Sequence, residues 1–355
     1  MSTITITHTN NPSVPPSPRE ALGFGRRFTD HMFIWNYQQG KGWTDPRIMP
    51  YSPLALDPSA MVFHYGQAIF EGMKAYRWED GGIHLFRPQL NFERMNRSAE
   101  RMDIPQFDAD TALEGLRTLL RVDEAFVPAD PGTSLYIRPF IIATEASLGV
   151  HSAEEFMFVI ICSPSGAYYS QGLAPVPILV EDRYVRAVRG GTGEAKTAGN
   201  YAASIKAQMA AKDKGYVQVL WLDGIERKYI EEVGAMNVFF VVDDAIYTPP
   251  LSGTILPGIT RRSAIELLRS QGREVIETPI ALEWLLEQAS EGRLTEAFGT
   301  GTAAVISPIG QLYADGSTYR INNNETGPVA QALYGDLTGI QTGMKEDTLG
   351  WTEQI

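Results

Sequence analysis

Short apolar runs alternate with polar residues through the first half of the chain. Runs typical of β-strands occur at residues 31–37, 61–66, 82–86, 134–144 and 156–162. Between them, apolar residues recur at helical spacing in 90–102 and 108–122. We therefore expect a small N-terminal α+β domain over residues 21–165, preceded by a flexible leader at 1–20 that is rich in Pro, Ser and Asn.

A stretch rich in Gly, Pro, Ser and Tyr follows, and it predicts an interdomain loop at 166–177. Beyond it, helical patterns at 200–215 and 260–272 alternate with strand patterns at 177–182, 217–223 and 237–250. Gly215 is a typical stop signal for the first of these helices. We expect a larger, β-rich C-terminal domain over 178–355, and so a two-domain protein of the α/β (α+β) class.

The composition of the chain limits the classes of molecule that we expect it to bind. The 355 residues are 44% hydrophobic, which is enough apolar material for two cores. A formal net charge of −12, without any Lys/Arg-rich run, disfavours nucleic acid and anionic membranes, and no segment approaches 18 consecutive apolar residues. The lone Cys162 lies in an apolar run, so no disulfide within the chain is expected. We expect a cytoplasmic protein that binds small molecules.

Two kinds of hydrolytic site are disfavoured. The five histidines are scattered and show no H-x-H or H-E-x-x-H spacing, so we expect no metal site. The sequence also has no G-x-S-x-G motif, which disfavours a serine hydrolase.

The segment GGTGEAKT at 190–197 differs at one position from a nucleotide-phosphate loop, because Ala195 stands where that loop has its second glycine. Asp223, at the end of an apolar run, resembles a magnesium-binding partner, so an NTPase stays an alternative. Lys196 could equally form a Schiff base with an aldehyde cofactor such as pyridoxal 5'-phosphate (PLP). Such a site needs a buried acid, for which Glu231 and Glu232 are candidates, and a phosphate cradle.

Two later segments could supply that cradle. In LPGITR the amides of Ile259 and Thr260 open a helical pattern, where the helix dipole favours an anion. GTGTAA, at 299–304, offers small residues and amides suited to a carboxylate or phosphate.

Eight motifs, in the same order and at similar spacing, closely resemble those of the branched-chain amino-acid aminotransferases, which are PLP enzymes of fold type IV. Between Phe24 and Trp351 they are FHYGQAIFEG, LFRPQLNFERM, LYIRP, SLGV, GEAKTAGNY, EEVGAMN, LPGITR and GTGTAA. The resemblance implies that the C-terminal domain binds PLP. It also implies ping-pong transamination of L-leucine, L-isoleucine and L-valine with 2-oxoglutarate, in a homodimer. D-Amino-acid transaminase and aminodeoxychorismate lyase, of the same fold, are the nearest alternatives.

The resemblance further implies a role for each cofactor residue. Lys196 would be the Schiff-base lysine and would move the proton at the substrate α-carbon. Tyr201 would hydrogen-bond the cofactor phenolate, and Glu232 rather than Glu231 would pair with the pyridine nitrogen. The phosphate would be held by Arg94, Ile259, Thr260 and Thr302.

The substrate pocket follows in the same way, with the α-carboxylate at Tyr136 and at the amides of Thr302 and Ala303. Arg138 is the cation expected to meet the side-chain carboxylate of glutamate. The remaining wall would be formed by Phe24, Phe70 and Tyr168, with Tyr65, Leu148 and Val150 reaching in from a second subunit.

The chain departs from this pattern in two places. Ala235 replaces a threonine that some relatives carry near the cofactor, which removes one hydroxyl contact. Ala304 and Ser307 stand where some relatives carry a C-x-x-C pair, so we expect no thiol switch there.

Overall fold

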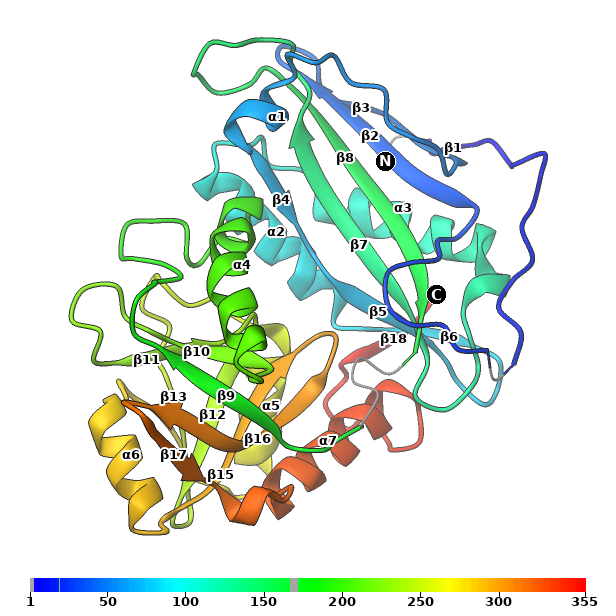
Figure 1. Cartoon of the computed structure of the whole chain (residues 1–355). Coiled ribbons are helices and arrows are strands. Elements are labelled where there is room, and N and C mark those ends of the chain that lie inside the picture. Colours follow the sequence, from blue (N-terminus) through cyan, green and yellow to red (C-terminus); the bar gives the residue numbers. More distant parts are fainter. Residues whose placement is uncertain (1–2, 19, 167–171) are drawn as a thin grey trace. The chain divides into compact units, whose positions relative to one another are not determined.

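The computed structural model describes residues 3–18, 20–166 and 172–355 (Figure 1). The chain divides into two compact units, each with its own sheet and core. The first unit contains the chain up to residue 168 together with 195–198 and 339–355, and the second contains 169–194 and 199–338. The predicted two-domain α+β architecture is confirmed. The short segments 195–198 and 339–355 join the first unit, which nothing in the sequence pattern indicated.

The sheet of the first unit is mostly antiparallel, and among the described residues its strand order is β1-β3-β2-β8-β7-β5-β6-β18, with β4 paired to β7. Its longest strands, β7 and β8, pair from Ser134↔Ser165 to Ala143↔Phe156. The strands are β1 Thr5–Ile6, β2 His31–Gln38, β3 Gly42–Pro50, β4 Ala68–Phe70, β5 Met73–Arg77, β6 Ile83–Phe86, β7 Ser134–Ala143, β8 Glu155–Ser165 and β18 Thr352–Gln354.

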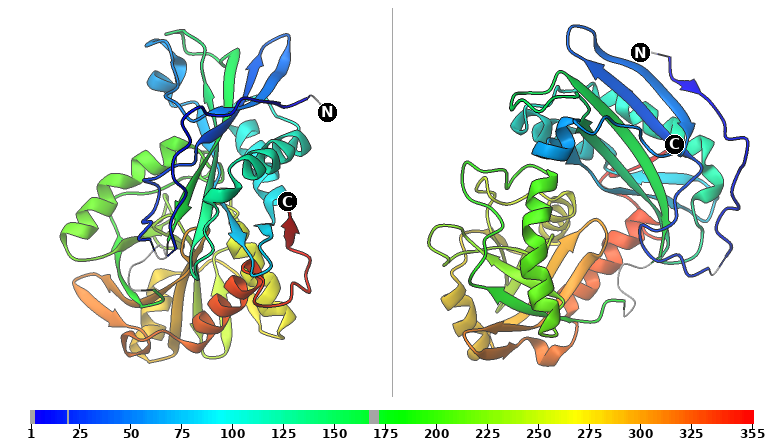
Figure 2. Two further views of the ribbon diagram at one scale, coloured as in Figure 1. Left: turned by 90° about the vertical axis from the view of Figure 1, so that its right-hand side faces the viewer. Right: turned by 45° about the horizontal axis from the view of Figure 1, so that its top comes forward.

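Helices α2 (Pro88–Arg101) and α3 (Ala109–Val122) pack against one face of this sheet (Figure 2). Their apolar stripes join alternate strand residues in a core that includes Phe33, Phe92, Leu116 and Phe158. Asp108 caps α3 by accepting the Thr111 N–H. Both helices lie where the apolar spacing predicted them.

The run at 61–66 forms helix α1 (Met61–Tyr65) and not the strand that its residue types indicated. Gly66 ends the helix in the left-handed conformation, with φ +61°, and donates its N–H to the Val62 carbonyl. The prediction was wrong because periodicity alone does not separate a short apolar helix from a strand.

The second unit also contains one large sheet, with the described strand order β11-β10-β9-β16-β15-β12-β13-β14 and with β17 paired to β16. Parallel pairs, such as β9 with β10 and with β16, lie beside antiparallel ones. The strands are β9 Val176–Glu181, β10 Gln218–Leu222, β11 Ile230–Val233, β12 Asn237–Val242, β13 Ala245–Thr248, β14 Val275–Glu277, β15 Leu294–Gly301, β16 Val305–Ala314 and β17 Ser317–Arg320.

The predicted helices of the second half are also found, as α4 (Ala198–Asp213) and α5 (Ile259–Ser270). Two further helices, α6 (Leu282–Ser290) and α7 (Pro328–Gln341), were not predicted. The sheet core of this unit includes Val238, Phe240, Leu285 and Leu312. In the part of the chain that the structure describes, no helix is long and apolar enough to cross a membrane.

Candidate functional site

The backbone around Lys196 is fixed within the first unit. The Lys196 N–H donates to Ser98 Oγ at 2.9 Å, and its carbonyl accepts the Phe70 N–H at 3.0 Å. The Thr197 hydroxyl donates to the Ala68 carbonyl at 2.8 Å. A phosphate loop uses the amide of its lysine and the hydroxyl of the next residue for its nucleotide and magnesium ion. Since the Lys196 amide and the Thr197 hydroxyl already bind protein atoms, the geometry argues against the NTPase alternative.

Asp223 is also a structural residue and not a magnesium ligand. Its carboxylate accepts the backbone N–H groups of Ile225, Glu226, Lys228 and Tyr229 at 2.7–3.0 Å. Burial raises the pKa of Asp223, but these hydrogen bonds outweigh it and lower the pKa to about 2. Among the residues that the structure describes, no group of three His, Cys, Asp or Glu side chains could hold a metal ion.

Glu71 and Arg94 form a buried ion pair close to Lys196. Arg94 Nε and Nη2 each lie 2.8 Å from a carboxylate oxygen of Glu71, and Asn91 donates to the same carboxylate at 2.8 Å. The side chains are 0% and 3% exposed for Glu71 and Arg94. Burial alone raises the pKa of Glu71, but the charges of Arg94 and Lys196 and the Asn91 hydrogen bond hold it below its usual value.

Three residues of the neighbourhood of Lys196 come from one stripe of helix α2. Asn91, Arg94 and Ser98 are spaced three and four residues apart, which puts them on the same helical face. Sequence reasoning named only Arg94 and missed Glu71, Asn91 and Ser98. Glu71 lies inside the motif FHYGQAIFEG, so a search for a carboxylate partner of Arg94 could have found it.

Aromatic side chains and one arginine gather on the other face of the first sheet. Phe24 lies edge-on to Tyr136 with 4.8 Å between ring centroids. The Arg138 guanidinium carbon lies 4.7 Å from the Phe70 ring centroid, and Arg138 Nη2 donates to the Tyr136 hydroxyl at 3.0 Å. Lys196 Nζ lies 5.0 Å from the centroid of the same Phe70 ring. The structure thus groups Phe24, Phe70, Tyr136, Arg138 and Lys196.

Two features of this group concern its polar atoms. Arg138 Nε is buried and has no hydrogen-bond partner among the described residues, so it is available to an anion. A side chain at Gly72 would collide with the Tyr136 hydroxyl, so glycine is needed there for Tyr136 to adopt this position.

The residues expected from a second subunit lie elsewhere in the first unit. Leu148 is 66% exposed, Val150 is 84% exposed, and Tyr65 is also exposed and donates its hydroxyl to the Leu148 carbonyl. Tyr168 lies outside the described residues.

The two adjacent carboxylates of the second unit differ in their surroundings. Glu232 Oε2 lies 3.0 Å from Arg186 Nε, and Glu232 Oε1 accepts the Leu256 N–H at 2.9 Å and Asn237 Nδ2 at 3.2 Å. These contacts stabilise Glu232 as an anion. Arg186 was not identified from the sequence.

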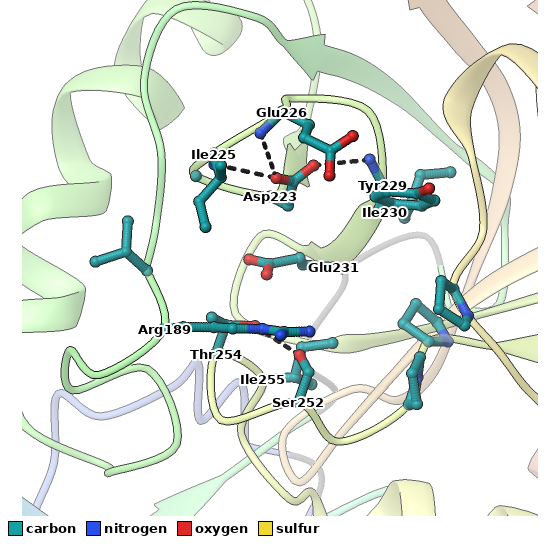
Figure 3. A pocket seen from close by; sticks show the side chains of 15 residues that line it. Arg189, Asp223, Ile225, Glu226, Tyr229, Ile230, Glu231, Ser252, Thr254 and Ile255 are labelled. Carbon is teal, nitrogen blue, oxygen red and sulfur yellow. Dashed lines mark hydrogen bonds between the residues drawn. The ribbon is translucent and has the colours of Figure 1, made fainter.

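Glu231, one residue earlier on β11, lines a cavity of about 340 Å³. Figure 3 shows its carboxyl group between the 223–229 turn and the segment that carries Ser252 and Thr254. Burial raises the pKa of Glu231. The hydrogen bond from Thr254 and the charge of Arg186 lower it, but they do not cancel the effect of burial. Of the two carboxylates, Glu232 is the one whose oxygens both contact positively polarised donors, Arg186 on one side and the Leu256 and Asn237 N–H groups on the other.

Helix α5 begins at Ile259, and no side chain caps its N-terminus. Gly258 is the N-cap residue, and the Asn237 Oδ1 atom occupies the space where a side chain at 258 would lie. The amides of Ile259 and Thr260 lie in the first turn of α5, where the helix dipole favours binding of an anion.

The turn between β15 and β16 carries Thr302 and Ala303. It closes with the Ile306 N–H donating to the Ala304 carbonyl at 2.8 Å, around Val305. Val305 has φ +62°, a strained backbone conformation for a β-branched residue. Ala304 lies in this turn and Ser307 follows on β16, whereas Cys162 is buried in β8.

Two other residues named from the sequence lie in the second unit. Tyr201 is in the first turn of α4 and is half-buried, and Ala235 is exposed in the turn after β11.

The chain is similar to known proteins over nearly its whole length. Residues 68–312 match the sequence profile of the family described as amino-transferase class IV. The Bacillus subtilis (strain 168) protein named branched-chain-amino-acid aminotransferase 2 is 55% identical over 353 residues, which cover 99% of this chain and 97% of the relative.

Solved structures agree. That of the Escherichia coli branched-chain amino acid aminotransferase aligns with a TM-score of 0.77 and 28% identity, covering 91% of this chain and 98% of that one. The structure of the branched-chain aminotransferase from the archaeon Thermoproteus uzoniensis with norvaline aligns with a TM-score of 0.76 and 26% identity, covering 91% and 99%. The chain therefore belongs to the branched-chain-amino-acid aminotransferase family, within amino-transferase class IV.

Proposed function

We propose that the protein is a PLP-dependent transaminase that moves the amino group of L-leucine, L-isoleucine or L-valine to 2-oxoglutarate, giving the branched-chain 2-oxo acids and L-glutamate. The observation that carries this proposal is Lys196, whose backbone is held by Ser98 and Phe70 in a segment matching the family motif. The high identity to named branched-chain aminotransferases supports the substrate class.

The residues present fit PLP. The uncapped α5 N-terminus, with Ile259 and Thr260, suits a phosphate, and we assign Thr302 and Arg94 to the same group. Glu232, kept anionic by Arg186, suits a protonated pyridine nitrogen, and Tyr201 is the candidate partner of the phenolate. When bound, PLP supplies an electron sink for the charge that develops at the substrate α-carbon.

The chain's own groups then have distinct tasks. Lys196 Nζ is the amine that reacts with the aldehyde and that carries the proton to and from the substrate α-carbon. Glu232 holds the proton on the pyridine nitrogen. Glu71 fixes the Arg94 guanidinium through two hydrogen bonds, so that its orientation is set before the phosphate arrives.

One pocket must accept both an apolar and an acidic substrate. We assign the α-carboxylate to the Tyr136 hydroxyl and to the amides of Thr302 and Ala303. The branched side chain would pack on Phe24 and Phe70. Arg138, whose Nε has no partner among the described residues, would meet the side-chain carboxylate of glutamate.

We further propose a homodimer, in which Tyr65, Leu148 and Val150 of one subunit complete the pocket of the other. Their exposure, together with that of Phe63 at 61%, supports this assignment, because exposed apolar side chains clustered on one unit mark an interaction surface. We expect Val150→Asp to shift the mass measured by sedimentation equilibrium towards a monomer. A wild-type protein that is monomeric at micromolar concentration contradicts the assignment. A cytoplasmic location also stays a prediction.

The activity is tested with PLP-loaded protein, L-leucine and 2-oxoglutarate, by quantifying 4-methyl-2-oxopentanoate and L-glutamate. We expect the two products in equal amounts. D-Leucine and aminodeoxychorismate serve as controls for the alternatives of the same fold, and a preference for either would overturn the proposal.

A further inference from the structure

The cavity beside Glu231 is lined by residues that have no role in the proposed transamination. Its volume of about 340 Å³ falls within the range of small-molecule sites, about 300–1,000 Å³. The lining residues come from 188–189, 223–231 and 249–255 together with Pro279, and all of them belong to the second unit. None of the residues assigned above to PLP or to a substrate is among them. We therefore consider the cavity as a site of its own.

The carboxyl group of Glu231 is a buried polar group on the wall of this cavity (Figure 3). Glu231 is 5% exposed, and its Oε2 atom has no hydrogen-bond partner in the described part of the chain. Buried polar groups in folded proteins are normally satisfied by protein, water or ligand. The missing partner of a carboxylate oxygen is a hydrogen-bond donor, and a cationic donor binds it most strongly.

The other charged residues of the cavity leave Glu231 as the acid that can bind a ligand. Asp223 also lines the cavity, but its carboxylate already accepts the backbone N–H groups of the 223–229 turn. Glu226 is exposed to solvent, where a charge is screened. Arg189 is exposed too, and it adds a guanidinium that can pair with a carboxylate. The cavity thus offers a buried acid and a cation at its edge.

Apolar side chains form much of the remaining wall. Ile255 is buried, whereas Val188 and Ile225 are 42% and 76% exposed. Pro249 and Pro250 add further apolar surface. A ligand that covers exposed apolar side chains removes their surface from water, which favours binding. The wall therefore suits a ligand with an apolar part as well as an ammonium group.

We propose that this cavity binds a free α-amino acid with an apolar side chain, with its ammonium group on Glu231 and its carboxylate on Arg189. The side chain of the ligand covers Val188 and Ile225. Each part of such a molecule has its complement in the cavity: a buried carboxyl group, a guanidinium and an apolar wall. The site is separate from the substrate pocket, so the proposal does not rest on the proposed function.

The test uses protein loaded with pyridoxamine 5'-phosphate, the aminated cofactor, which has no aldehyde to react with an amino group. The substrate pocket is first saturated with 4-methylpentanoate, which has the carboxylate and the branched chain of leucine but no amino group for Glu231. L-Leucine is then titrated by calorimetry. We expect one further molecule to bind per chain, and the absence of this second binding event would overturn the proposal.

A pair of variants locates the leucine that binds. Glu231→Gln should weaken its Kd roughly tenfold or more, the size of one charge-assisted contact. Glu226→Gln, which removes an exposed carboxylate from the same cavity, is the matched control and should change the Kd by less than about twofold. A Glu231→Gln protein that binds leucine as tightly as wild type would overturn the proposal.

The role of Arg189 is tested with 3-methylbutylamine, which is leucine without its carboxylate. Arg189→Met should weaken the binding of leucine several-fold and leave that of 3-methylbutylamine unchanged, and a variant at this exposed position should fold. An unchanged Kd for leucine, or an equal loss for both ligands, would overturn the carboxylate assignment.

The affinity for 4-methylpentanoate separates this site from the substrate pocket. Both Glu231→Gln and Arg189→Met should keep the wild-type Kd for 4-methylpentanoate. A parallel loss of its binding would place the leucine in the substrate pocket and overturn the separate site. Failure of the proposed function is distinguishable, because the wild-type protein would then convert no branched-chain amino acid while the leucine titration kept its outcome.

Discussion

Arg94 donates two parallel hydrogen bonds to Glu71, from Nε to Oε1 and from Nη2 to Oε2. Both are 2.8 Å long and both are excluded from solvent. The guanidinium that the family motif assigns to a phosphate thus has a fixed protein partner, 23 residues away in sequence. A bidentate pair of this kind sets the plane of the guanidinium as well as its position.

Removing one member of the Glu71–Arg94 pair should destabilise the folded protein. We expect Glu71→Gln to lower the free energy of unfolding by about 3–5 kcal/mol, because it leaves a buried guanidinium without its counter-charge. Urea titration of the protein followed by tryptophan fluorescence measures this. Glu114→Gln, which removes the exposed ion pairs with Arg117 and Arg121 in the same unit, is the control and should change stability by at most about 1 kcal/mol.

The same pair has a pH signature. Since the pKa of Glu71 lies below its usual value, its stabilising contribution is present above the unfolded pKa near 4.5 and is lost as pH falls through the folded value. The difference between wild type and Glu71→Gln should therefore shrink below pH 4.5. A difference that stays constant down to pH 3 contradicts a charged Glu71.

The buried Lys74 should affect stability at alkaline pH, in the opposite direction to Glu71. Its folded pKa of about 8 lies below the unfolded value of 10.5, so burying the charged form costs stability at all pH values below 8. That cost disappears as pH rises from 8 to 10.5. We expect Lys74→Met to be more stable than wild type at pH 7 by about 3 kcal/mol, and the advantage to vanish near pH 10.5.

Thermal unfolding of both apoproteins at pH 7 and pH 10 measures the Lys74 effect. Lys228→Met, at a lysine exposed in the second unit, is the matched control and should show no such pH-dependent gain. A Lys74→Met variant that is less stable than wild type at pH 7 contradicts the prediction.

Arg138 predicts a change in specificity. We expect Arg138→Met to lower the specificity constant for glutamate by roughly tenfold or more while sparing leucine, because only glutamate brings a second carboxylate against the Phe70 wall. Single-turnover rates for both amino acids on the same variant measure it. An equal loss for both would mean that Arg138 serves the fold through its contact with Tyr136.

Cys162 should be inert. It is buried in β8, and burial together with the charge of Asp123 raises the pKa of its thiol well above the usual value. Thiols of this kind are neither accessible nor ionised, so activity should not change under mild peroxide. Reversible inactivation that dithiothreitol restores would show that the thiol reacts.

Periodicity predicted helices α2, α3 and α5 because each shows a sustained apolar stripe. Helix α4 has no such stripe, since Ile205 and Met209 are exposed, and its clearest signal was the stop at Gly215. Periodicity did not predict α1, which has only five residues, nor the return of the C-terminal segment to the first sheet as β18. Pairing of β18 with β6 joins residues more than 260 apart, and no local pattern encodes such a contact.

In the site, too, the sequence revealed residues with a local motif but not their long-range partners. Lys196 and Glu232 stand in motifs whose residue types signal their chemistry. Their supports, Ser98 and Arg186, are 98 and 46 residues distant and look like ordinary helix and loop residues in the sequence. Only the fold brings Ser98 close to Lys196 and Arg186 close to Glu232, because contacts between residues far apart in sequence depend on tertiary packing.

The central claim is that Lys196 is the amine that reacts with PLP and moves the substrate proton. Its most direct measurement is the absorbance of purified wild type and Lys196→Ala after incubation with PLP and removal of the excess, followed by addition of L-leucine. The account predicts that wild type shows a yellow, pH-sensitive band that leucine bleaches within one turnover. Lys196→Ala should still fold but lack that band and convert leucine at a rate lower by several orders of magnitude. A Lys196→Ala protein that shows the wild-type band and near-normal transamination would contradict it.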